Sequence, residues 1–229
     1  MTARVRQSCF LIAAALGTAL VARLPAADPN FVGAWIGVSA ISADGRTITT
    51  PDTARISLYT PENGFSSGVM VGRHLTDIFS LQGSYLRNSN SLLLTSSTSS
   101  SDDFSLYEQR RKATMDIAIA EVLVYARKRG SSVRPYVTVG GGMVRVSSAP
   151  GSIVVQSSNS REPPGAFSTW SPAIQVGVGV DVPLGKGWAF RYAFNETISR
   201  GNPISDQLEP PGLRNLANFQ NLWGFTKSF

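Results

Sequence analysis

Residues 218–229 read Asn-Phe-Gln-Asn-Leu-Trp-Gly-Phe-Thr-Lys-Ser-Phe, and their large aromatic side chains all fall on odd-numbered positions. Side chains of a β-strand point alternately to opposite faces, so Phe219, Trp223, Phe225 and Phe229 share one face of an extended segment. The opposite face carries mainly Asn, Gln, Gly, Thr and Ser. This stretch therefore predicts a final strand that is aromatic on one side and small or polar on the other.

The same period of two recurs in residues 174–182, Ile-Gln-Val-Gly-Val-Gly-Val-Asp-Val, and in residues 188–195, Trp-Ala-Phe-Arg-Tyr-Ala-Phe-Asn. In the first segment the second face is mostly glycine, which suits the crowded interior of a narrow barrel. In the second segment four aromatics line one face, and facing water they would favour aggregation. Facing lipid they are normal, so the two segments predict neighbouring strands of a membrane β-barrel.

Connections of alternating length separate the predicted strands. Short connections are expected at 74–77, 127–132 and 183–187, and long polar ones at 89–112, 147–169 and 199–215. Short turns on one side and long loops on the other are typical of outer-membrane barrels. Further strands are predicted at 65–73, 78–88, 114–127 and 133–147. In the last of these, the valines change phase across Gly140–Gly142, which predicts a β-bulge there.

The strand count depends on the identity of the first strand. Counting back from Phe229 gives eight strands if residues 54–60 form the first, whereas residues 31–41 are a rival for that place. Counting both would give nine, and odd numbers are disfavoured in bacterial single-chain barrels. We therefore predict an all-β, eight-stranded antiparallel up-and-down transmembrane β-barrel over residues 53–229. Residues 28–52 are then a lead-in, with 31–41 as an extra or alternative first strand.

The beginning of the chain has the layout of a secretory signal peptide. Arg4 and Arg6 precede an apolar run over residues 9–22, and small residues follow at Ala26 and Ala27. The run is shorter than the roughly 20 residues of a transmembrane helix. We expect residues 1–27 to be removed. The single cysteine of the chain lies in this segment, so disulfides and cysteine-based metal sites are not expected in the mature protein.

Composition agrees with a barrel and argues against nucleic-acid binding. Charged residues make up 16% of the chain and the mean hydropathy is +0.00; ordinary soluble domains carry about 25% charged residues. Low charge without long apolar runs is expected when lipid-facing and lumen-facing residues alternate. Three arginines of the formal +6 charge lie in the predicted signal peptide. The remaining net charge is small, and no basic run contains interspersed aromatic residues, so the sequence does not indicate nucleic-acid binding.

From about residue 54 onward, the chain resembles small bacterial outer-membrane β-barrel proteins related to the transmembrane domain of outer membrane protein A. The resemblance is carried by Arg-Pro-Tyr-Val at 134–137 before the glycine run, Gly-Val-Gly-Val-Asp at 177–181, the aromatic-Arg strand and the terminal Phe. It implies a Gram-negative outer-membrane location. It also implies an assembly signal at Gly224, Phe225 and Phe229, although Lys227 stands where the family usually has an apolar residue.

The resemblance further implies outer-membrane lipids and lipopolysaccharide, the barrel assembly machinery and periplasmic chaperones as partners. Inside the barrel, Asp181 and Arg191 flank a short turn and are predicted to pair across neighbouring strands, with Gln175 and Asn195 on the same inward faces. A buried pair of this kind is retained only when it is well hydrogen-bonded. We interpret it as part of a polar plug, since an eight-stranded barrel is only wide enough for its own side chains or one small ligand.

No catalytic, cofactor or metal site is predicted. The single histidine, His74, is interpreted as a solvated residue of a periplasmic turn, far from outer-leaflet chemistry. Acidic residues in or near the long loops match no defined calcium loop: Asp102, Asp103, Glu108, Glu196, Asp206 and Glu209. We therefore predict a non-enzymatic protein with a structural or surface-interaction role. The alternatives are a narrow porin-like channel or small-ligand carrier and, less favoured, a lipid-modifying enzyme.

Overall fold

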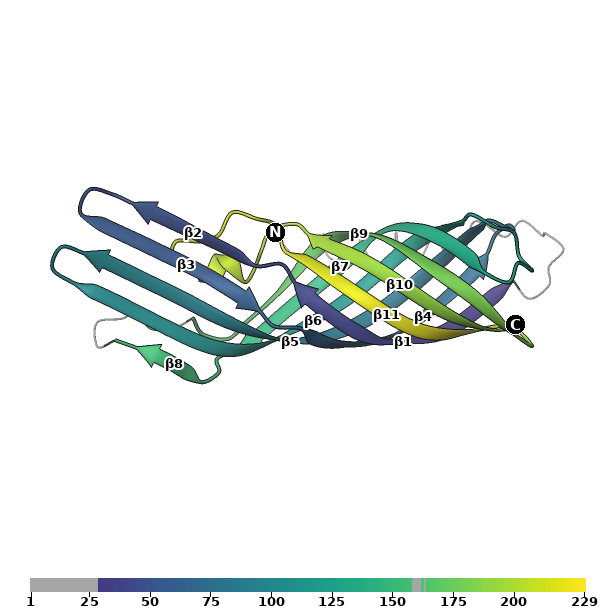
Figure 1. The fold of residues 1–229 in the computed structure, drawn as a ribbon, viewed down its shortest axis with the longest axis horizontal. Helices are drawn as coiled ribbons and strands as arrows, with labels where there is room; N and C mark the ends of the chain where they lie inside the picture. Colours follow the sequence, from purple (N-terminus) through teal and green to yellow (C-terminus); the bar gives the residue numbers. More distant parts are fainter. Residues whose placement is uncertain (1–28, 158–161, 163) are drawn as a thin grey trace, which may run out of the picture.

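The computed structural model describes residues 29–157, 162 and 164–229, and the predicted signal peptide lies outside them. Figure 1 shows an elongated molecule with a barrel at one end and a narrower projecting sheet at the other. No helix in the described ranges is long and apolar enough to cross a membrane. The strands are β1 (Asn30–Ile41), β2 (Asp44–Thr49), β3 (Thr53–Pro61), β4 (Gly64–His74), β5 (Phe79–Ser100), β6 (Phe104–Tyr125), β7 (Arg134–Ala149), β8 (Ile153–Gln156), β9 (Phe167–Gly185), β10 (Trp188–Ser199) and β11 (Ala217–Ser228).

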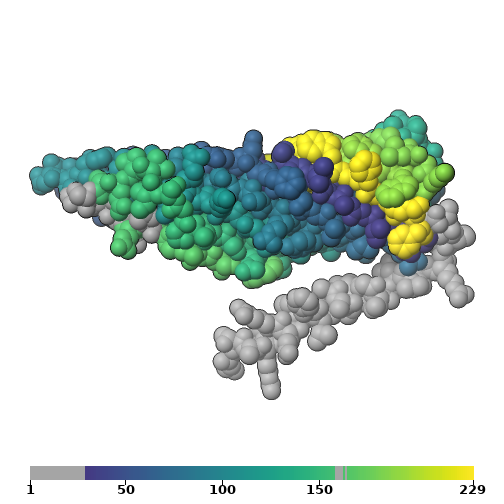
Figure 2. All heavy atoms as spheres, turned by 90° about the horizontal axis from the view of Figure 1, so that it is seen from below, coloured from purple at the N-terminus to yellow at the C-terminus, as the bar shows by residue number. Residues whose placement is uncertain are grey.

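Eight of these strands form a closed antiparallel ring in the order β1-β4-β5-β6-β7-β9-β10-β11. Pairing of β1 with β11 closes it, from Phe31 opposite Ser228 to Ile41 opposite Asn218. Figure 2 shows these two segments, purple and yellow, side by side at the barrel end. The predicted eight-stranded up-and-down barrel is confirmed.

The predicted first strand is wrong. Residues 31–41 form β1, which lies between β4 and β11 in the ring. Residues 54–60 lie in β3, which pairs with β2 and with the outer part of β5, outside the ring. The difference lies in length: β1 presents Val32, Ile36 and Val38 to lipid along 12 residues, enough for a transmembrane strand of about 9–11 residues. The predicted strand 54–60 is shorter than that. Most of residues 28–52 thus belong to the ring and to β2 rather than to a lead-in.

The predicted long loop 89–112 is mostly strand. β5 and β6 are 22 residues each, about twice the 9–11 residues that a transmembrane strand needs. Their outer parts pair with β3 and β8, so a five-stranded sheet of order β2-β3-β5-β6-β8 rises beyond the barrel (Figure 1). We call this sheet the extension: β2, β3, β8, residues 92–100 and residues 104–111. Its Ser and Thr side chains are polar, whereas the inward-facing Leu92 and Leu94 are buried and give its base an apolar inner face.

The predicted β-bulge at Gly140–Gly142 is also wrong. β7 pairs with β6 and β9 without a shift of register along its length. Val137 and Val139 point to lipid, whereas Val144 and Val146 point inward in the same alternation. The valines change faces because the lumen itself changes from polar to apolar at this height.

The lipid-facing surface has the predicted aromatic pattern. Aromatics of β10 and β11 meet in three cross-strand pairs: Phe190 with Phe225, Tyr192 with Trp223, and Phe194 with Phe219. Their ring centroids lie 5.7, 6.1 and 6.5 Å apart, respectively. Cross-strand aromatic pairs stabilise a sheet and give it a large apolar surface.

Candidate functional site

The interior of the barrel is the candidate site, and its inner, periplasmic half is built on Arg191. Arg191 of β10 and Asp181 of β9 lie opposite each other and form a bidentate ion pair. Arg191 Nε lies 2.5 Å from Asp181 Oδ1, and Nη2 lies 2.6 Å from Oδ2. Arg191 is 1% exposed and Asp181 is 4% exposed. The barrel interior has a low dielectric constant, so a buried charge without a counter-ion is very costly there. The close pairing of the guanidinium with the carboxylate avoids that cost.

The remaining guanidinium donors of Arg191 are also used. Nη1 donates to Gln82 Oε1 at 2.6 Å, and Nη2 donates to the Tyr125 hydroxyl at 2.8 Å. Tyr125 in turn donates to Asp181. The guanidinium also lies 5.2 Å from the Phe31 ring centroid and 5.4 Å from that of Tyr136. This cluster ties together six strands of the ring, β1, β5, β6, β7, β9 and β10, and fills the lumen at its level.

Glu121 is the centre of a second cluster. Its carboxylate accepts hydrogen bonds from Gln82 (2.8 Å), Ser84 (3.1 Å), Thr138 (2.6 Å) and Gln175 (3.3 Å). Thr197 donates to the side-chain amide oxygen of Gln175. Glu121 is 4% exposed, and four neutral donors take the place of water around its charge. Gln82 contacts both Arg191 and Glu121, so the two clusters form one network.

Above this network lies a layer of amides and hydroxyls. Asn88 accepts from Ser66 at 2.6 Å and from Gln220 at 3.4 Å, while Ser39 and Asn90 exchange hydrogen bonds. Asn195, predicted to face inward, is buried at this level. Several amide atoms here have no protein partner among the described residues, and ordered water commonly bridges such atoms.

The outer half of the lumen is apolar. Side chains of the ring and of the extension form one buried cluster that contains Leu86, Leu92, Leu94, Met115, Ile117, Ile119, Val144, Val146 and Leu222. Three residues of the β10–β11 connection, Ile204, Leu208 and Leu216, belong to the same cluster and are 1–3% exposed. The connection is thus folded onto the mouth of the barrel and covers it.

Buried polar contacts hold this connection in place. Asn202 Nδ2 donates to the Tyr59 hydroxyl at 3.0 Å, and its Oδ1 accepts from the backbone N–H groups of Ile204 and Ser205, where the short 3-10 turn Ser205–Gln207 begins. Ser205 donates to Asp44 Oδ2 at 2.6 Å. Burial raises the pKa of Tyr59 above its ordinary value, while the hydrogen bond from Asn202 acts in the opposite direction. We call residues 200–216 the cap.

A second connection is held by Arg111, which is 1% exposed on the inner face of β6. Its guanidinium donates to the carbonyl oxygens of Pro164 and Gly165, both at 2.6 Å, and to Ser148 at 3.1 Å. It also lies over the Phe167 ring. Arg111 therefore fixes the segment that leads into β9.

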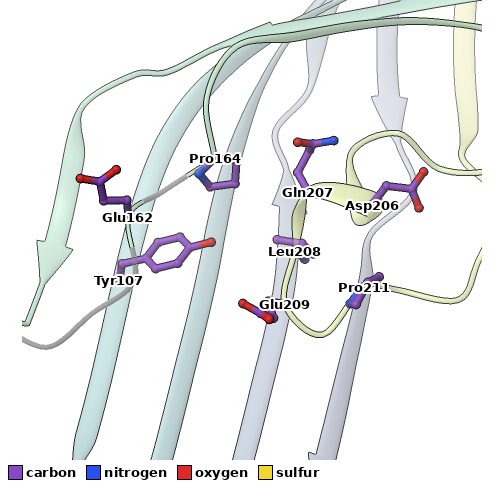
Figure 3. A pocket seen from close by; sticks show the side chains of 8 residues that line it. All are labelled: Tyr107, Glu162, Pro164, Asp206, Gln207, Leu208, Glu209 and Pro211. Carbon is purple, nitrogen blue, oxygen red and sulfur yellow. The ribbon is translucent and has the colours of Figure 1, made fainter.

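A cavity of about 340 Å³ lies at the outer mouth. Figure 3 shows side chains from β6, from the segment before β9 and from the cap around it. They are Tyr107, Glu162, Pro164, Asp206, Gln207, Leu208, Glu209 and Pro211. Three of the eight are acidic, which gives the cavity a negative wall on a partly apolar base. No cluster of three potential metal-ligating side chains is present among the described residues.

His74 is not the solvated turn residue of the prediction. It ends β4 at the periplasmic mouth, half-buried, with its ring centroid 4.8 Å from that of Phe31. Its Nδ1 lies 2.7 Å from Ser80 Oγ. The neighbouring Arg134 lies over the Tyr125 ring at 3.8 Å and donates to the Asp77 carbonyl. His74 is thus a packing residue at the end opposite the acidic cavity.

The other predicted site residues lie on the final strand. Gly224 faces the lumen beside Trp35, and Phe225 and Phe229 are exposed at the periplasmic end. Their reading as an assembly signal stays a prediction. Sequence reasoning missed Glu121 as a lumen residue, although an acid inside the otherwise apolar run 117–125 was a usable signal. It also missed Asp44 and Arg111, for which the sequence offers no local signal.

Comparison with known proteins agrees with this architecture. The profile of the outer membrane protein beta-barrel domain matches residues 11–217. Neisserial surface protein A is similar in structure, with a TM-score of 0.52, 16% identity, and coverage of 87% of this chain and 97% of that chain. OprG of Pseudomonas aeruginosa matches with a TM-score of 0.46 and 13% identity, over 88% of this chain and 96% of its own.

The outer membrane protease OmpT of Escherichia coli matches with a TM-score of 0.47 and 7% identity, over 91% of this chain and 99% of that one. No curated protein matches the sequence. At 16% identity, the match to Neisserial surface protein A bears on the fold alone. The match of the family profile to most of the chain shows that this protein belongs to the outer membrane protein beta-barrel domain family, located in the bacterial outer membrane.

Proposed function

We propose that this barrel is a non-enzymatic, non-conducting membrane anchor that presents its extension at the cell surface for interaction. The observation that carries the proposal is the filled interior. The network of Arg191 and Glu121 occupies the inner half, and the apolar cluster with the cap occupies the outer half. An ion would have to displace both layers to cross.

The extension supports an interaction role. It projects beyond the ring, and its edge strand β8 carries three exposed aliphatic residues, Ile153, Val154 and Val155. An open edge with exposed backbone groups is suited to pairing with a partner strand. A non-enzymatic role is supported by the position of His74, since it lies at the end opposite the acidic side chains of the outer mouth.

Planar-bilayer conductance tests the closed interior. We expect purified, refolded protein to insert without discrete channel steps, and a variant that lacks cap residues 202–214 to remain closed because the polar network persists. Regular steps from the wild-type protein would overturn the proposal.

A matched cell-surface experiment tests the role of the extension. Cells that display the wild-type protein are compared with cells whose extension tip, residues 97–104, is replaced by a two-residue turn. We expect the shortened protein to reach the outer membrane yet to lose adhesion to immobilised extracellular proteins. Equal adhesion by both strains at equal surface amounts would contradict the role.

A small-ligand carrier is the second candidate, and the acidic cavity is the observation that favours it. Its volume of about 340 Å³ lies within the range of small-molecule sites, roughly 300–1,000 Å³. A carrier role predicts saturable binding of small cationic amphiphiles, which equilibrium dialysis would detect.

A further inference from the structure

The outward faces of β5, β6 and β7 carry an uneven distribution of charge. Arg87, Asp116 and Arg145 are direct cross-strand neighbours, and Trp170 of β9 follows in the same row. Lys112 is exposed two outward positions above Asp116 on β6, with residue 114 between them. We call Arg87, Lys112, Arg145 and Trp170 the basic row.

The basic row lies at the upper border of the lipid-facing band. Below it on the same strands, outward positions are apolar, as at Tyr85, Ala118 and Met143. Arg87 is eight residues beyond Phe79, where β5 begins. With about 3.3 Å per residue and a tilt of about 40°, this is a height of roughly 20 Å, close to the roughly 25 Å of an outer-membrane apolar band.

Other sides of the barrel lack such a row. Among described residues, the outward positions of β1, β4, β9, β10 and β11 carry three charged side chains. Arg73 and Lys227 lie at the periplasmic ends, and Glu196 lies toward the outer end of β10. Within the described residues of these five strands, no positive side chain lies at the outer border.

Local contacts leave guanidinium donors of the row available. Asp116 accepts from the Tyr85 hydroxyl at 2.8 Å and lies 3.7 Å from Arg87 Nε. The Arg87 side chain is nonetheless 62% exposed. Arg145 donates from Nε to Ser168 at 3.0 Å and lies 6.0 Å from the Trp170 ring centroid, so that neutral groups orient its guanidinium without neutralising it.

Nearby carboxylates do not cancel the positive charge. Arg110, further out on β6, is engaged by Glu62 at 3.1 Å, and Glu108 lies beyond it. Within the row itself, two arginines and one lysine face a single carboxylate, Asp116. The net charge is therefore +2 at a border where a polar headgroup meets hydrocarbon.

We infer that the basic row binds the phosphate groups of lipopolysaccharide in the outer leaflet. A guanidinium can donate bidentate hydrogen bonds to a phosphate. Basic residues next to a bilayer are also attracted electrostatically by anionic headgroups. Lipopolysaccharide carries phosphates on a sugar backbone at this height, while its acyl chains descend along the apolar surface below the row. Trp170, 57% exposed, lies where an aromatic ring packs at a membrane interface.

The test uses protein refolded in detergent without lipopolysaccharide, with folding verified by heat-modifiable gel mobility. Native mass spectrometry then measures binding of three probes: bisphosphorylated lipid A, monophosphorylated lipid A and phosphatidylglycerol. The test variant is Arg87→Gln/Arg145→Gln. The matched control, Arg55→Gln/Arg73→Gln, removes the same charge from β3 above the membrane and from the periplasmic end of β4.

We expect wild-type protein to bind bisphosphorylated lipid A more tightly than monophosphorylated lipid A, and phosphatidylglycerol least. The test variant should bind lipid A about tenfold more weakly or worse, with the control variant unchanged. Equal weakening of both variants, or no weakening of the test variant, would overturn the inference. Phosphatidylglycerol binding as tight as that of lipid A would overturn the assignment to lipopolysaccharide. None of these outcomes depends on whether the barrel conducts, so the inference and the proposed function fail separately.

Discussion

Ser205 donates a hydrogen bond to Asp44 across 161 residues of chain, at 2.6 Å and with both side chains buried. Asp44 also accepts from the backbone N–H groups of Gly45 and Arg214. The start of β2 and the cap are therefore joined through one carboxylate. This contact makes closure of the outer mouth depend on the extension, and the two regions are expected to loosen together.

Replacing Ser205 with Ala should weaken the cap without unfolding the ring. Loss of one donor to a buried carboxylate costs about 1–3 kcal/mol, and a cost in that range raises the opened fraction of the cap several-fold or more. Limited proteolysis of folded protein measures this as faster cleavage within residues 200–216. Ser99→Ala, at an exposed position of β5, is the control. Unchanged cleavage of Ser205→Ala would mean that Asp44 is held by its backbone partners alone.

Tyr59 should make the cap sensitive to high pH. Burial raises the pKa of Tyr59 above its ordinary value, which is about 10. The stability from the neutral hydroxyl is thus complete below pH of about 10 and is lost as the pH rises through the folded-state pKa. Ultraviolet difference titration of wild-type protein against Tyr59→Phe isolates this group. A midpoint at or below that of an exposed tyrosine would contradict the burial of Tyr59 by the cap.

The sequence predicted the barrel more accurately than the extension, and the reason is physical. Every second side chain of a membrane strand faces lipid and must be apolar. The alternating pattern of residues 174–182 and 188–195 therefore identifies membrane strands directly. The extension has water outside, so residues 89–100 have no such constraint and resemble a loop. The pair of Asp181 and Arg191 flanks a two-residue turn and could be anticipated locally. Asp44 and Ser205 meet only because the cap folds back, which no short-range pattern encodes.

Breaking the pair of Arg191 and Asp181 from one side should be more harmful than removing both charges. Asp181→Asn leaves the buried guanidinium without its counter-ion, which costs about 3–5 kcal/mol. The double variant Asp181→Asn/Arg191→Met removes both charges and should recover part of that loss. Urea unfolding followed by gel mobility measures all three proteins. If the double variant is no more stable than Asp181→Asn, the shape of Arg191 rather than its charge holds the network.

Removing Phe229 should impair assembly in cells and leave intrinsic stability nearly intact. Phe229 is 58% exposed at the periplasmic end and contributes backbone hydrogen bonds with Asn30 at the β1–β11 seam. Phe229→Ala keeps those backbone bonds and removes only the ring, so refolding into detergent should proceed as in the wild type. If the ring is part of the signal read by the assembly machinery, less folded protein will accumulate in the outer membrane of expressing cells. Trp188→Ala, which removes another exposed aromatic from the same end, separates a general loss of apolar surface from loss of a terminal signal. Equal accumulation of Phe229→Ala and wild type would show that the terminal aromatic is dispensable and that the seam itself, with its continuous β1–β11 register, is sufficient for insertion.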